Sequence, residues 1–152
     1  MMARFTQFGI YEYSGSSSDG TWIIEGGTLQ DPQPTFSGDP MFSGDWSSVG
    51  NIISFNIDVN FGNILTFGTG QYYLKLPFPS HDNRLLSDGC LHDILNNNDQ
   101  YSIVGHVTAG SDILELFSIT SNGRQNPFTK QVPVTLHNED FFHISGVYEK
   151  NH

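Results

Sequence analysis

The chain has 152 residues and carries 16 Asp and Glu against 6 Lys and Arg, for a formal net charge of −10. This balance argues against nucleic acid as a partner, because phosphate binding depends on Lys and Arg that displace counterions. Keeping a β-rich protein in solution explains the acidity equally well. Hydrophobic residues make up 37% of the chain and charged residues only 14%. That composition suits one packed domain of strands and turns better than long amphipathic helices, whose wet face needs Glu, Lys and Arg.

Secreted and membrane-bound classes are disfavoured too. The first residues lack the apolar stretch of a signal peptide, and no apolar run approaches the roughly 18 residues of a membrane span. Cys90 is the single cysteine, so no disulfide can form within the chain, and a buried structural thiol is expected there. We therefore expect a protein that is made and used in solution, without a membrane partner.

The first 43 residues predict an extended arm or a loose hairpin. Aromatic residues crowd its start, a Gly- and Ser-rich stretch interrupts it at residues 14–20, residues 21–25 suit one strand, and a proline-rich run follows. So short a segment cannot bury its aromatic side chains alone, so they must cover either the main body or a neighbouring subunit. The predicted interface residues are Phe5, Phe8, Tyr11, Tyr13 and Trp22.

The clearest predicted strand covers residues 52–61. Apolar and polar side chains alternate there without a break, which predicts a sheet with one buried and one solvent-exposed face. The expected core residues are Ile53, Phe55, Ile57, Val59 and Phe61.

Shorter apolar segments follow at the spacing of a sandwich or barrel. Residues 64–67 form a short apolar run, and residues 72–76 predict a strand that Pro77 ends. The polar segment 80–100 contains one undecided stretch, residues 91–95, which suits a helical turn or a short strand. Because the connections are short, the sheets are expected to be antiparallel. Further strands are predicted at residues 101–108, 113–120, 132–136 and 141–149.

The sequence contains no motif for catalysis or cofactor binding. Residue types that bind metals gather between residues 81 and 93, where solvated loop side chains are the commoner explanation; they are His81, Asp82, Asp88, His92 and Asp93. Three histidines are assigned to predicted strands, where a hydrogen-bonded structural role is commoner than general-base catalysis; they are His106, His137 and His143. We therefore expect no enzyme activity, no cofactor and no metal.

A series of short motifs resembles a known family. Residues 44–51 (Gly-Asp-Trp-Ser-Ser-Val-Gly-Asn) lead into the alternating strand, and Phe61-Gly62 ends it. Residues 66–72 (Thr-Phe-Gly-Thr-Gly-Gln-Tyr) then lead to Leu76-Pro77-Phe78, and residues 144–149 (Ile-Ser-Gly-Val-Tyr-Glu) close the chain. This order resembles a β-sandwich domain of many tailed-bacteriophage structural proteins, which include capsid decoration (cement) proteins and the tips of tail fibres. The resemblance spans about residues 44–149, and residues 1–43 have no counterpart in it.

The resemblance implies a virion structural protein without catalytic residues. The expected fold is all-β: an antiparallel, jelly-roll-like β-sandwich of residues 44–152 with an N-terminal arm or hairpin of residues 1–43. The expected function is a decoration protein that binds the outer surface of the phage head as a homotrimer, with the major capsid protein as partner, after assembly in the host cytoplasm. The shortness of the chain, without a fibre shaft, favours the head.

Two alternatives remain open. A tail-fibre tip would recognise a host-surface glycan, and a free carbohydrate-binding module would bind glycans without a virion. Both predict exposed aromatic side chains that stack on sugar rings.

Overall fold

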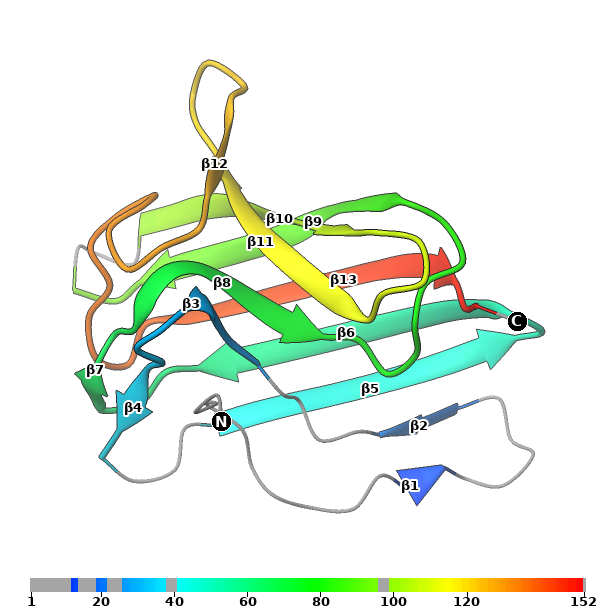
Figure 1. Ribbon diagram of the computed structural model, residues 1–152. Coiled ribbons are helices and arrows are strands. Elements are labelled where there is room, and N and C mark those ends of the chain that lie inside the picture. Colours follow the sequence, from blue (N-terminus) through cyan, green and yellow to red (C-terminus); the bar gives the residue numbers. More distant parts are fainter. Residues whose placement is uncertain (1–11, 14–18, 22–25, 38–40, 96–98, 152) are drawn as a thin grey trace.

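The computed structural model describes residues 12–13, 19–21, 26–37, 41–95 and 99–151 (Figure 1). The described residues contain β-strands and no helix, and every strand pairing among them is antiparallel. The prediction of an all-β antiparallel fold is therefore confirmed. The described part of the chain contains no helix long and apolar enough to cross a membrane.

The strands vary from two-residue pairs to ten-residue segments. In chain order they are β1 (Glu12–Tyr13), β2 (Asp19–Thr21), β3 (Gly26–Gln30), β4 (Thr35–Phe36), β5 (Met41–Val49), β6 (Ile52–Asn60), β7 (Ile64–Thr66), β8 (Thr69–Lys75), β9 (Arg84–Asp93), β10 (Asp99–Val107), β11 (Ile113–Ile119), β12 (Gln125–Pro127) and β13 (Phe141–Glu149).

Eleven of these strands form one curled sheet, in the order β1-β2-β5-β6-β13-β9-β10-β11-β8-β3, with β12 paired to β11. Strands β4 and β7 form a separate two-stranded sheet. In Figure 1, β5, β6 and β13 run side by side, and β8 and β11 cross over them as the sheet curls back on itself. The inward sides of these two parts supply one shared apolar core.

The alternation predicted for residues 52–61 is confirmed. The five expected core residues are each at most 2% exposed, while the residues between them face outward. Aromatic rings then link the two parts of the curled sheet. Phe61 directly follows β6. Its ring centroid lies 5.9 Å from that of Tyr72 in β8 and 5.7 Å from that of Phe142 in β13. Phe128 touches the same pair, with centroid distances of 5.2 Å to Tyr72 and 5.6 Å to Phe142.

Three strands approach one another most closely at Gly89 of β9. A Cβ atom at this position would lie 2.5 Å from the carbonyl oxygen of Ile103 in β10 and 3.1 Å from that of His143 in β13. Both obstacles are backbone atoms, which cannot swing aside as a side chain can. Glycine is therefore required for β9 to fit between its two neighbours.

Two predictions about segments need revision. The undecided stretch 91–95 belongs in large part to a strand, because β9 runs as far as Asp93. The predicted strand at residues 132–136 is wrong, because this segment is a loop that bonds to itself: Leu136 N donates to Lys130 O over 2.8 Å. Pro133 lacks the N–H group that a strand pairing at this position would need.

Part of the predicted arm joins the sheet. Strand β3 pairs with β8 at the edge of the main sheet, and β2 pairs with β5. The predicted boundary between residues 43 and 44 falls within β5. A separate arm therefore stays a prediction for residues 1–11, 14–18 and 22–25, which lie outside the described residues.

Ile57→Ala should lower the free energy of unfolding by about 2–5 kcal/mol, because it leaves a cavity under β6. Asn56→Ala is the matched control, since its side chain faces outward and its hydrogen bond to Asp45 is exposed. Urea titration of both variants measures the difference. Equal losses would contradict a sheet with a single buried face.

Gly89→Ala should lower the free energy of unfolding by about 1–3 kcal/mol, the usual cost of forcing extra atoms into packed structure. Asp88→Ala is the matched control, since it changes an exposed, outward-facing residue of the same strand and adds no atom between the strands. A Gly89 variant with unchanged thermal and urea midpoints would refute the close approach of β9, β10 and β13.

Candidate functional site

The outward-facing residues of β5, β6, β13 and β9 form one continuous surface, which we call the outer face. The strand register shows its composition, because one row across it contains Ser43, Asp58, His143 and Cys90. The adjacent row contains Asp45, Asn56, Ser145 and Asp88. Hydrogen bonds join neighbours along this second row, from Asn56 Nδ2 to Asp45 Oδ1 over 3.1 Å and from Ser145 Oγ to Asp88 Oδ2 over 3.0 Å.

The outer face is polar without being basic. Strands β5, β6 and β13 contain no Lys or Arg, and their outward positions are mostly Ser, Asn and Asp. Short side chains lose less rotamer entropy than Lys or Glu when another molecule covers them. Cores of protein interfaces are depleted in Lys and Glu but equally in Asp and Ser, whereas interface rims are polar. The polar rows therefore suit the rim of a contact with a protein surface.

One end of the outer face is apolar. Val49, Ile52 and Val147 are 83%, 45% and 49% exposed. Val49 and Ile52 are paired across the β5–β6 turn, and Val147 lies opposite Ser54 on the next strand. The three aliphatic side chains therefore occur together where these strands end.

The opposite end holds three metal-ligand types, which we call the Cys–His cluster: Cys90, His92 and His143. One donor atom from each lies within 4.8 Å of the other two. The His92 ring stacks on Phe141 with centroids 4.3 Å apart and planes 12° apart, and it lies 5.8 Å from the His143 ring. Burial raises the pKa of the Cys90 thiol, and burial followed by the charge of His143 lowers the pKa of His92.

The expectation of a buried structural thiol at Cys90 is wrong. The side chain is half-buried on the outer face, because strand alternation turns Leu91, fully buried, toward the core instead. The sequence alone did not predict the Cys–His cluster, because the cluster depends on how two distant strands pair. Cys90 and His143 are far apart in the chain, and only the pairing of β9 with β13 sets them opposite each other.

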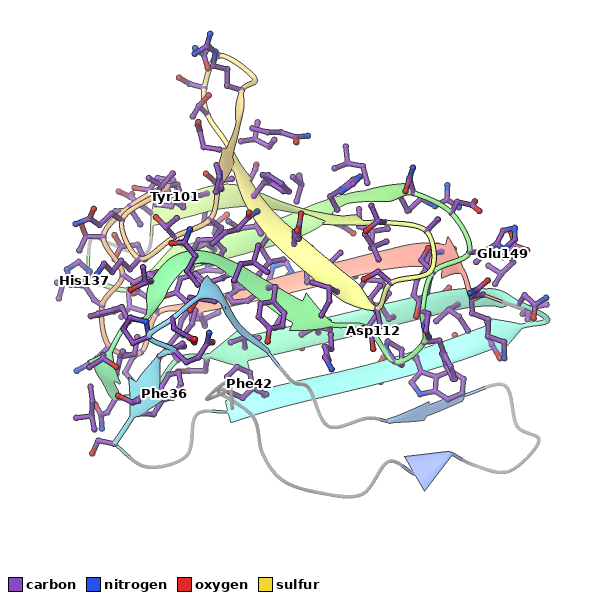
Figure 2. All side chains as sticks on the ribbon, viewed as in Figure 1. Phe36, Phe42, Tyr101, Asp112, His137 and Glu149 are labelled. Atoms are coloured by element: carbon purple, nitrogen blue, oxygen red, sulfur yellow. The ribbon has the colours of Figure 1, made fainter. Side chains whose placement is uncertain are left out.

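A second cluster lies at the same end of the molecule and joins β9 to the loop before β13. Asp93 and Asp140 are fully buried, and His137 Nδ1 lies 3.7 Å from Asp93 Oδ1 and 4.0 Å from Asp140 Oδ2. The two Asp140 oxygens accept hydrogen bonds from Ile94 N, over 3.0 Å, and from His137 N, over 2.8 Å. Figure 2 shows His137 and Tyr101 at this end. These hydrogen bonds hold the two loops together, so this second cluster has a structural role.

The metal-type residues predicted between residues 81 and 93 do not form one group. His81 and Asp82 group with Glu149, near the far end of β13. His92 and Asp93 contribute to different clusters, because adjacent strand residues face opposite sides. Among the histidines assigned to strands, His106 and His143 lie in β10 and β13, but His137 lies in a loop, which corrects that assignment.

The predicted interface residues Phe5, Phe8, Tyr11 and Trp22 lie outside the described residues. Tyr13 lies in the short strand β1, and the structure gives no account of its side chain. Their role in an interface stays a prediction.

Comparison of the chain with protein-family models, with curated proteins and with solved structures found no match. The functional argument therefore depends on the outer face, the two clusters and the sequence resemblance.

Asp140→Asn tests the structural role of the second cluster through the pH dependence of the free energy of unfolding. Burial is the first cause that raises the pKa of Asp140, so the neutral carboxyl is the form that the fold favours. The stability that it contributes is full below the ordinary Asp pKa of about 3.9 and is lost as the pH rises through the raised value. The free energy of unfolding of the unmodified protein relative to the variant should therefore fall across this acidic interval and level off above it. Urea titrations at several pH values measure this, and a difference that grows with pH would show that the assigned direction is wrong.

Proposed function

We propose that the protein is a non-catalytic structural protein that decorates the outer surface of a bacteriophage head as a homotrimer. The observation that carries the proposal is the outer face, a broad sheet surface of short polar and small apolar side chains whose three main strands lack Lys and Arg. The proposal includes a jelly-roll-like sandwich, which the curled sheet around one core supports.

The outer face suits docking because a partner could bury the apolar side chains at one end and form hydrogen bonds with the polar rows beside them. Val49, Ile52 and Val147 would act as apolar anchors. Fully covering an exposed side chain of this kind contributes roughly 1.5–3 kcal/mol, and about half of that for Ile52 and Val147, which are already half-buried. The polar rows between the strands would supply hydrogen bonds around them. The net charge of −10 fits a position outside the head, away from packaged DNA.

The partners are the major capsid protein and further copies of the chain. Aromatic residues near the N-terminus are proposed to extend the contact between copies, since a segment so rich in Gly and Ser cannot bury them alone. These residues are Phe5, Phe8, Tyr11, Tyr13 and Trp22.

One observation favours the alternative of a tail-fibre tip that recognises a host-surface glycan. The β11–β12 hairpin projects from the body of the sheet (Figure 1). Its residues 121–125 are exposed and polar, as in a loop that reaches a receptor.

Val147→Lys tests the proposal. Fluorescently labelled protein is mixed with purified heads and, separately, purified tails of the phage whose genome encodes the chain, and each mixture is sedimented. The unmodified protein should sediment with heads. The variant should bind at least about tenfold more weakly, which corresponds to about 1.4 kcal/mol, because it loses the apolar contact of Val147 and also places a charge in the contact.

Leu65→Lys is the matched control, because Leu65 is 65% exposed on β7, outside the outer face. It should leave head binding unchanged. Sedimentation with tails alone would favour the fibre-tip alternative, and binding to neither particle would contradict a virion role. Equilibrium sedimentation of the free protein tests the trimer separately.

A further inference from the structure

We propose that the Cys–His cluster binds a divalent transition metal ion of the zinc type on the outer face. Cys90, His92 and His143 would be its protein ligands. The inference concerns a metal site and does not depend on the proposed place in a virion.

The register of β9 and β13 provides the geometry. His143 lies directly opposite Cys90, and His92 follows two residues later on the same side of β9. Their donor atoms lie within 4.8 Å of one another. In a tetrahedral zinc site, bonds of about 2.0–2.3 Å place the donor atoms roughly 3.4–3.7 Å apart. Each donor pair is therefore at most about 1.4 Å wider than in a tetrahedral zinc site, and all three side chains lie on the same side of the sheet.

An unsatisfied nitrogen points independently to a ligand. His92 Nδ1 is buried and has no hydrogen-bond partner among the described residues. Such an atom costs free energy unless a hydrogen bond or a bound group satisfies it. The stacked Phe141 ring restricts the orientation of the imidazole, so little side-chain freedom is left to lose on binding.

The donor chemistry selects the class of ion. One thiolate and two imidazoles suit zinc and other late first-row divalent ions, whereas magnesium and calcium prefer carboxylate and carbonyl oxygens. Binding releases the thiol proton of Cys90 to solvent, because the thiolate is the ligand. His143 is exposed, so the ion enters directly from solvent, and the fourth position is open to water.

The second cluster is the weaker candidate, although its His137 Nδ1 also has no hydrogen-bond partner among the described residues. The carboxylates of Asp93 and Asp140 are engaged by backbone N–H groups of Leu95, Ile94 and His137. A metal ion would have to compete with bonds that hold two loops in place. The Cys–His cluster is therefore the one to test.

The test is a Co²⁺ titration of the full chain, kept reduced with a phosphine and followed by absorbance. Cobalt replaces zinc and shows a thiolate-to-metal charge-transfer band only when a cysteine ligates it. We expect one ion per chain with this band, displacement of the ion by Zn²⁺, and a rise in the thermal midpoint with Zn²⁺. His143→Gln should weaken binding by at least about 10–100-fold, the loss that even an outer-sphere partner of a metal site produces.

Cys90→Ser should abolish the charge-transfer band. His81→Gln is the matched control, since it removes a histidine from the other end of β13 and should leave binding unchanged. Circular dichroism confirms that each variant is folded, and the exposed position of His143 keeps one informative variant available if Cys90→Ser does not fold. Absence of binding, binding without the band, or equal losses in the His143 and His81 variants would overturn the proposal.

Discussion

Hydrogen bonding on both edges of β13 holds the sheet together. This strand pairs with β6 along all nine of its residues and with β9 from Phe141 to Ser145. Its buried Tyr148 also fixes the connection between β8 and β9, because the phenol donates to Phe78 O over 2.9 Å and accepts from Phe78 N over 3.2 Å. Without β13 the strands on its two sides would share no pairing along the sheet. The outer face and the Cys–His cluster both exist only because β13 joins β6 to β9.

Strand β9 separates two kinds of chemistry across the thickness of one sheet. His92 faces outward beside Cys90, and the next residue, Asp93, is buried with Asp140. Each group includes an imidazole nitrogen without a hydrogen bond among the described residues, His92 Nδ1 and His137 Nδ1, but only the inward group has carboxylates that accept hydrogen bonds from backbone N–H groups. The alternation of side chains along β9 therefore places a candidate metal site on the surface and a structural cluster in the core.

The sequence predicts those strands in which alternation alone determines burial. Residues 52–61 were foreseen for this reason, since Ile57 and its neighbours alternate with polar residues. Strand β9 was not, because a buried Asp93 and the glycine at position 89 break the apolar pattern that marks a strand. Its polar core residue accepts a hydrogen bond from Leu95 N and lies 3.7 Å from His137 Nδ1 of a distant loop, a contact that sequence periodicity does not contain. The Cys–His cluster was out of reach too, because it depends on the register between two segments about 50 residues apart.

The central place of β13 also constrains how the chain reaches its folded state. During synthesis β6 and β9 leave the ribosome well before residues 141–149, and each carries an edge that only those residues will cover. Pairing between such distant segments is slow because a long loop must first close. A nascent chain therefore exposes two open edges that a neighbouring nascent chain can capture. Rapid overproduction should favour that misassembly, and slower synthesis or chaperone binding should favour the native fold.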